Sequence, residues 1–81
     1  MEKYRIKQSI MGCPGTFSET VLKDASLKEA KAFLLMKFNL YTGLNCLDWE
    51  AACAVKQTDI IAEEDSLQLE DILYTLIRNE Q

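Results

Sequence analysis

The strongest pattern of apolar and polar positions in this sequence runs from Ser26 to Tyr41 and predicts an α-helix. Apolar residues recur at helical spacing along one side of this stretch, and polar residues occupy the other side. Ser26 and Glu29 have the spacing of a capping box, in which each side chain accepts a hydrogen bond from the other residue's backbone N–H. Gly43 can adopt the positive φ that ends a helix. The expected core-facing residues are Leu27, Ala30, Phe33, Leu34, Phe38 and Tyr41.

Two stretches before this helix predict a β-hairpin. Residues 4–11 alternate between apolar and polar positions, as a strand with one buried face does. Pro14 and Gly15 follow in a turn of residues 12–15, and residues 17–23 are rich in the Thr, Val and Phe that strands favour. The register that keeps the apolar side chains on one face pairs Met11 with Thr16, Ile10 with Phe17, Gln8 with Glu19, Ile6 with Val21 and Tyr4 with Lys23.

Residues 47–56 fit two different structures. As a strand, this stretch turns Trp49, Ala51, Cys53 and Val55 inward; as a helix, it is capped by Asp48 and collects Trp49, Ala52, Cys53 and Ile60 on one side. We choose the strand, because a hairpin of two strands alone is only marginally stable. A right-handed crossover through the helix then lays this third strand antiparallel to residues 4–11, which gives the sheet order 2-1-3.

The end of the sequence predicts a second helix, which begins at Asp65 or Ser66 and runs through about Asn79. Its apolar residues follow the spacing of an amphipathic helix: Leu69, Ile72, Leu73, Leu76 and Ile77. We expect Phe33, Leu34 and Leu73 to be largely buried. The expected fold is therefore α+β, with the element order ββαβα, a three-stranded antiparallel sheet of order 2-1-3, two helices on one face, and a single domain spanning residues 1–81.

The composition excludes several classes of protein. Apolar residues at 48% and charged residues at 27% are typical of a folded domain and exclude wholesale disorder. No apolar run approaches the roughly 18–20 residues of a membrane span. The N-terminal residues alternate in charge and lack the apolar segment of a signal peptide. We therefore expect a protein of the cytoplasm of its host cell, without a membrane partner.

Charge is divided unevenly along the chain, whose net charge is −4. Residues 1–41 contain seven Lys and Arg against four Asp and Glu, whereas residues 42–81 contain two against nine. Such a concentration of one sign attracts complementary partners and raises association rates, although a solvated loop and helix start would show it too. The candidate partner-binding residues are six acids with no base among them: Asp59, Glu63, Glu64, Asp65, Glu70 and Asp71.

Lys3, Arg5 and Lys7 form the alternative candidate surface, which would bind nucleic acid. These bases share the polar face of the first expected strand with no aromatic residue, whereas sheets that bind single strands stack bases on aromatic side chains. In the expected sheet, Asp48 and Glu50 lie beside Arg5 and Lys7 and partly neutralise them. The pI of about 4.7 also disfavours approach to a polyphosphate. Nucleic acid is therefore a disfavoured partner.

No residue pattern in the sequence supports catalysis or metal binding. Cys13, in the expected turn, has no histidine anywhere in the chain to activate its thiol. Glu19 beside Gln8 could hold a proton, but no second ionisable group is expected within its reach. The three cysteines lack CxxC spacing, and no Gly-Lys-Ser/Thr follows Gly12 and Gly15 as a phosphate loop requires. We expect no enzyme activity, no metal and no cofactor.

These observations indicate a small, acidic, non-enzymatic interaction protein. The concrete hypothesis is an inhibitor or regulator whose acidic half docks on a basic, nucleic-acid-binding surface of a larger protein, as phage-encoded anti-defence proteins do; size and charge alone carry that comparison. The alternatives are a nucleic-acid-binding module that uses the basic face and a self-associating regulatory subunit such as a homodimer. Self-association is favoured by apolar residues left outside the expected core: Leu35, Leu40, Leu44 and Leu47.

Overall fold

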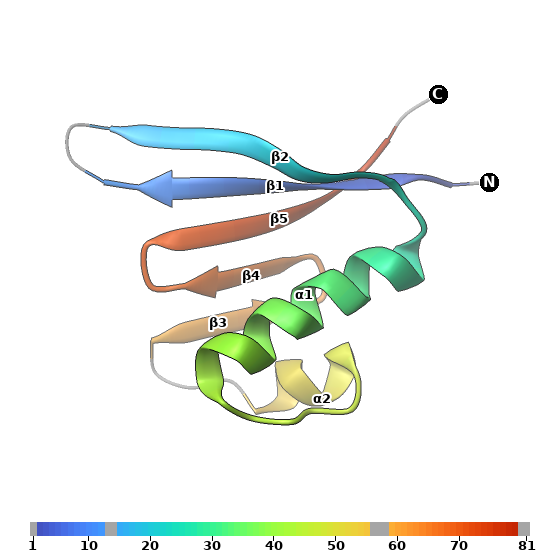
Figure 1. Cartoon of the computed structure of the whole chain (residues 1–81), viewed down its shortest axis with the longest axis vertical. Coiled ribbons are helices and arrows are strands. Elements are labelled where there is room, and N and C mark those ends of the chain that lie inside the picture. The colour runs from blue at the N-terminus through green and yellow to red at the C-terminus, as the bar shows by residue number, and fades with distance from the viewer. Residues whose placement is uncertain (1, 13–14, 56–58, 80–81) are drawn as a thin grey trace.

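The computed structural model describes residues 2–12, 15–55 and 59–79 and has two layers, a five-stranded antiparallel sheet and two helices on one of its faces (Figure 1). The elements are β1 (Tyr4–Met11), β2 (Thr16–Ala25), α1 (Leu27–Thr42), α2 (Trp49–Ala54), β3 (Ile60–Glu63), β4 (Ser66–Leu69) and β5 (Ile72–Arg78). The strand order is β2-β1-β5-β4-β3, so the last strand of the chain is central. The α+β class is confirmed, but the element order is ββααβββ, and the three-stranded ββαβα arrangement is wrong.

The first two strands form the expected hairpin, with part of the expected register. Met11 pairs with Thr16, Ile10 with Phe17 and Gln8 with Glu19, as predicted. A β-bulge then shifts the register twice, once on each side of Ile6, so that Ile6 pairs with Leu22 and Tyr4 with Ala25 instead of Val21 and Lys23. Asp24 adopts a φ of 54° in this irregular stretch. The bulge brings Ala25, rather than the charged Lys23, into the core at 3% exposure.

Helix α1 forms as predicted, with both ends fixed by the expected residues. Ser26 Oγ accepts a hydrogen bond from the Glu29 N–H at 3.1 Å, and Glu29 Oε1 accepts one from the Ser26 N–H at 3.2 Å. Gly43 adopts a φ of 76°, and its N–H donates to the Asn39 carbonyl at 2.9 Å. Of the expected core-facing residues, Ala30, Leu34 and Phe38 are buried, Phe33 is half-buried, and Leu27 and Tyr41 are exposed.

The ambiguous stretch after α1 forms a helix, so the strand predicted for residues 47–56 is wrong. Asp48 caps α2, and its Oδ1 accepts a hydrogen bond from the Ala51 N–H at 2.8 Å. Trp49 and Ala52, three residues apart, are the buried residues of α2. The argument for a strand assumed that the hairpin needed a partner from this stretch, but β5 supplies that partner.

Residues 66–79 form β4 and β5 rather than the predicted second helix. These strands pair antiparallel, with Leu67 opposite Tyr74 and Leu69 opposite Ile72. Because Leu69 and Ile72 face the same side across a two-residue turn, their spacing of three imitates a helical period. Glu70, in that turn, has a φ of 55°, a left-handed conformation that is foreign to a helix interior.

The new strands also change the environment of Leu73 and the sheet order. Leu73 pairs with Ser9 of β1 and Gln68 of β4 on the side away from the helices, and it is half-buried rather than a core residue. The neighbour of β1 is β5, so the order 2-1-3 is wrong. We call the sheet side away from the helices the open face; its β1 and β5 residues are Arg5, Lys7, Ser9, Leu73, Thr75 and Ile77.

The core lies between the sheet and α1. Its largest fully buried side chains are Ile6 of β1, Leu34 and Phe38 of α1, and Leu67 of β4. Trp49 attaches α2 to this core, because its ring meets Phe38 edge to face with 6.3 Å between centroids. The Cα atoms extend over 37 × 37 × 16 Å, as a layer pair does. The described parts of the chain contain no helix long and apolar enough to cross a membrane.

Candidate functional site: an acidic edge of the sheet

Five of the six acids singled out in the sequence lie in or next to β3 and β4. The sixth, Asp71, lies in the turn between β4 and β5, where its carbonyl accepts a hydrogen bond from the Met11 N–H of β1 at 2.9 Å. We call the six acids the acidic edge: Asp59, Glu63, Glu64, Asp65, Glu70 and Asp71. All six residues are exposed. The expected single acidic stretch is nevertheless divided, because β3 and β4 run antiparallel. Three acids surround the β3–β4 turn (the turn group: Glu63, Glu64, Asp65), and three lie at the other end of the two strands (the Tyr41 group: Asp59, Glu70, Asp71).

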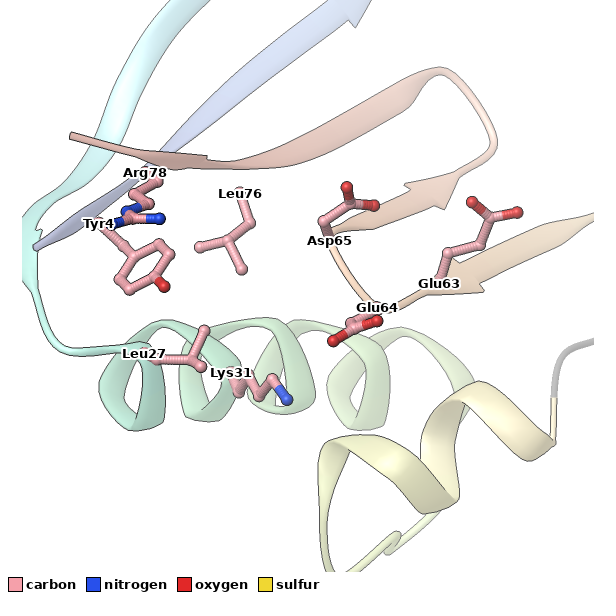
Figure 2. A pocket seen from close by; sticks show the side chains of 8 residues that line it. All are labelled: Tyr4, Leu27, Lys31, Glu63, Glu64, Asp65, Leu76 and Arg78. Carbon is pink, nitrogen blue, oxygen red and sulfur yellow. The ribbon is translucent and has the colours of Figure 1, made fainter. Parts of the chain in front are cut away.

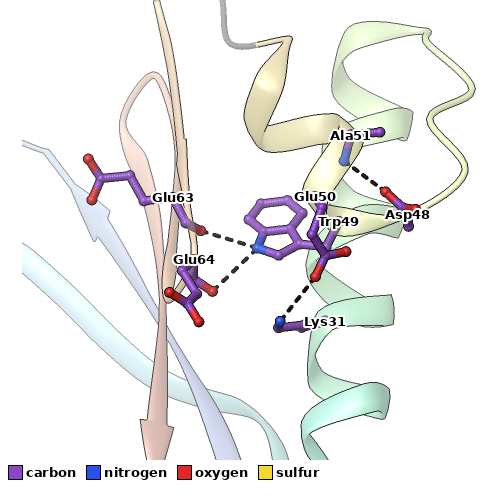
Figure 3. A network of polar contacts seen from close by, with 7 residues as sticks. All are labelled: Lys31, Asp48, Trp49, Glu50, Ala51, Glu63 and Glu64. Atoms are coloured by element: carbon purple, nitrogen blue, oxygen red, sulfur yellow. Dashed lines mark hydrogen bonds and ion pairs between the residues drawn. The ribbon is translucent and has the colours of Figure 1, made fainter.

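The turn group is anchored on the helical layer by a single side chain. The Trp49 indole N–H donates to the Glu63 carbonyl at 3.1 Å and to the Glu64 carbonyl at 3.3 Å (Figure 3). The Asp65 carbonyl accepts a hydrogen bond from the Leu76 N–H of β5 at 2.9 Å. All three acids therefore have a fixed backbone while their carboxylates remain exposed.

The Tyr41 group takes its name from the tyrosine at the end of α1. The Tyr41 hydroxyl donates to Glu70 Oε1. This hydrogen bond, with desolvation and the negative charges of Glu70, Asp59 and Asp71, raises the pKa of Tyr41 to about 12. The same three acids, with Ile61 and Gln68, line a shallow hollow of about 490 Å³.

A second hollow, of about 440 Å³, lies between α1 and the turn group (Figure 2). Tyr4, Leu27 and Leu76 contribute its less polar walls, and the turn group contributes carboxylates. Two cations also line this hollow, but each already pairs with an acid outside the acidic edge. Lys31 Nζ lies 3.2 Å from Glu50, and Arg78 pairs with Glu2 at 2.6 Å. Neither ion pair of the described residues uses a member of the acidic edge.

The alternative basic surface lies on the opposite half of the sheet. Arg5 and Lys7 are on the open face, and Lys3 precedes β1, where its carbonyl accepts a hydrogen bond from the Asn79 N–H at 2.8 Å. Asp48 and Glu50 belong to the cap and first turn of α2, so the predicted neutralisation of Arg5 and Lys7 by these acids is wrong.

The residues that surround this basic surface in the structure add positive charge to it, so it is more basic than the sequence predicted. Arg5 shares a hollow of about 800 Å³ with two further bases, Lys23 and Arg78, and with one acid, Asp24. Sequence reasoning missed both bases, because the bulge that turns Lys23 outward and the pairing of β5 with β1 leave no local signal. No aromatic residue accompanies these bases on the open face of the described strands.

The structure also locates the residues considered for chemistry. Cys13 lies outside the described residues. Glu19 and Gln8 are cross-strand neighbours as predicted, and Glu19 is exposed. Within residues 2–12, 15–55 and 59–79, no three His, Cys, Asp or Glu side chains are close enough together to hold a metal ion. The acidic edge and the basic surface therefore remain the candidate sites.

No family model, curated protein or solved structure matches this chain.

Proposed function

We propose that this protein is a non-enzymatic inhibitor or regulator that docks its acidic edge on a basic surface of a larger protein. The partner surface would be one that binds nucleic acid, as in the phage-encoded anti-defence proteins that share this size and charge. An acidic protein covering such a surface excludes the nucleic acid by occupying the same cations.

The observation that carries this proposal is the gathering of the six acids around β3, β4 and the turns at their ends. Arg5, Lys7 and Lys23 belong to β1 and β2, and β5 separates these strands from β4 and β3. Its carboxylates are exposed and outside the described ion pairs, so they are available to a partner's Lys and Arg side chains. Complementary potentials of this kind raise the association rate and reject partners of like charge.

The division of the acidic edge into two groups predicts how the basic residues of the partner should be spaced. Along β3, Asp59 of the Tyr41 group and Glu63 of the turn group are four residues apart, a length of about 13 Å at 3.3 Å per residue. Two clusters of bases on the partner, separated by a similar distance, would meet both groups at once. A single cluster would meet one group and leave the other in solvent.

The test captures the partner from the protein's native host and compares two multiple variants. The first reverses Glu63, Glu64, Asp65, Glu70 and Asp71 to Lys, and the second reverses Lys3, Arg5 and Lys7 to Glu. Each exposed pair contributes only about 0–1 kcal/mol, so single changes should be weak. The fivefold reversal should nevertheless reduce binding by orders of magnitude, with an unchanged circular dichroism spectrum.

Salt dependence and nucleic-acid competition complete the test. Retention of the partner should fall steeply between low and moderate salt, and the partner should lose its nucleic-acid binding when the protein is added. The protein alone should not shift labelled single-stranded DNA or RNA. If the triple reversal of the basic residues abolishes activity and the fivefold acid reversal does not, the proposal fails.

A further inference from the structure

Apolar side chains gather on the side of α1 that faces away from the sheet. Ala32, Met36 and Leu40 follow one another at four-residue spacing and so form a single row along the helix. Met36 is 47% exposed and Leu40 is 74% exposed, although both are large apolar residues. Leu47, in the segment after α1, is 94% exposed. Together with the half-buried Leu35, these residues form what we call the α1 outer patch.

A groove of about 570 Å³ lies beside the first half of this row. Its apolar walls come from Leu27, Ala32, Leu35, Leu47 and Trp49, and its polar rim comes from Lys28, Lys31, Asp48 and Glu50. The Lys31–Glu50 ion pair links α1 to α2 at this rim (Figure 3). The first half of α1 therefore presents a recess around a small residue, and the second half presents two protruding side chains.

We propose that the α1 outer patch is the interface of a homodimer in which two copies of α1 pack antiparallel about a two-fold axis. In this arrangement, Met36 and Leu40 of each copy enter the groove of the other. A two-fold interface requires such self-complementarity, because every contact between two residues occurs twice with the copies exchanged. A groove and its matching projections on the same helix meet that requirement.

The charges at the ends of α1 favour the antiparallel arrangement. Lys28 lies in the first turn, at the positive end of its own helix dipole, and the last turn of α1 has no basic residue. The acid of the first turn, Glu29, is held by its own helix cap, because its carboxylate accepts a hydrogen bond from the Ser26 N–H. Antiparallel packing brings each Lys28 to the negative end of the other helix, where a cation is stabilising. A parallel arrangement would place the two Lys28 side chains together. The homodimer uses none of the six acids and does not rest on the proposed function.

The expected dimer is weak, because the contact is short. The sixteen residues of α1 give a helix about 24 Å long. With the segment that ends at Leu47, the contact falls below the ~800 Å² per partner of a standard interface. We expect a dissociation constant on the order of 10 µM.

Sedimentation equilibrium from about 5 to about 500 µM, which brackets that constant, tests the dimer directly. Wild-type protein should pass from mostly monomer to mostly dimer. Leu40→Glu, which removes a projection, and Ala32→Lys, which fills the groove, should each weaken the dimer at least about tenfold. Both positions are exposed, and circular dichroism confirms that the variants fold. Ile61→Glu on the open face is the matched control and should dimerise like wild type.

A mixture of the two variants tests the reciprocal geometry. In the mixed dimer, one of the two symmetric contacts keeps its native residues, and the other places the Glu at position 40 beside the Lys at position 32. The mixture should therefore form more dimer than either variant alone. Three results would overturn the proposal: a wild-type monomer across the range, a dimer that survives both substitutions, or a mixture that is no better than its components.

Discussion

Trp49 is the residue that joins the helical layer to the acidic edge. Its ring is 3% exposed and packs against Phe38, and its indole N–H bonds the carbonyls of Glu63 and Glu64. A phenyl ring at this position would preserve the ring contact but has no N–H to donate. Trp49 is therefore the side-chain donor that ties the backbone of Glu63 and Glu64 to the helical layer.

Trp49→Phe should lower the free energy of unfolding by about 1–3 kcal/mol, because two carbonyls lose their donor and the smaller ring leaves a void. Denaturant titration followed by circular dichroism measures this change. Trp49→Ala should cost more, about 3–5 kcal/mol. If Trp49→Phe unfolds at the same denaturant concentration as wild type, the two hydrogen bonds contribute nothing measurable.

Tyr41 reports on the electrostatic field of the Tyr41 group. With its pKa raised to about 12, it should stay protonated at a pH where an unfolded chain's tyrosine, with its ordinary pKa near 10, ionises. The stability from this hydrogen bond is then fully present below pH 10 and is lost as the pH rises from 10 through about 12.

The prediction is read from tyrosinate absorbance, using the difference between wild type and Tyr41→Phe to isolate this residue. Glu70→Gln should bring the titration of Tyr41 back toward its ordinary pKa, because the hydrogen bond to the Glu70 carboxylate is the main cause of the shift and Gln offers only a neutral acceptor. An unchanged titration in Glu70→Gln would mean that Glu70 is not that cause.

At the scale of elements, side chains on the two faces of β4 and β5 differ in burial and should therefore differ in their contribution to stability. Leu34→Ala and Leu67→Ala should each cost about 2–5 kcal/mol, because both side chains are fully buried. Leu73→Ala should cost less than about 1.5 kcal/mol, because Leu73 is only half-buried on the open face. Thermal and denaturant unfolding of the three variants checks this ranking. A loss at Leu73 equal to that at Leu34 would instead fit the helix predicted from the sequence.

Elements with local signals were predictable, and elements defined by distant pairing were not. The capping box of Ser26 and Glu29 and the left-handed Gly43 lie within or next to the helix that they delimit, so α1 was correct. The alternation of residues 4–11 likewise revealed β1. By contrast, β5 is a strand because it pairs with β1, far away in sequence, and the turn at Glu70 made its apolar spacing resemble a helix.

The candidate site was predictable to a similar extent. The acids of the acidic edge are exposed, as their sequence pattern indicated, but their division into two groups follows from a hairpin that the sequence analysis missed. Trp49 was expected in the core, and its bonds to Glu63 and Glu64 depend on the helix that was rejected for residues 47–56.

At the scale of the whole molecule, positive and negative charges are concentrated on different parts of the sheet. Arg5, Lys23 and Arg78 gather where β1, β2 and the end of β5 meet, whereas the acidic edge lies around β3, β4 and the turns at their ends. A partner approaching from solution should therefore be oriented before contact is made.

This separation of charge predicts that the turn group mainly affects the rate at which the protein associates with the captured partner. Reversing Glu63, Glu64 and Asp65 to Lys should lower the association rate constant by more than about tenfold at low salt and flatten its salt dependence, with a smaller change in dissociation. Surface-based kinetics at several salt concentrations provide the measurement, with the triple reversal of Lys3, Arg5 and Lys7 as control. A change confined to dissociation would argue for short-range contacts instead.

The central position of β5 in the sheet affects how the protein folds during its synthesis on the ribosome. β1 and β2 are synthesised first, but each sheet half lacks its neighbour until residues 72–78 emerge, because β5 pairs with both β1 and β4. Until then, the nascent chain exposes unpaired strand edges that invite association with other chains. The sheet can therefore be completed only after β5 has emerged, in one step that joins β1 to β4 through β5.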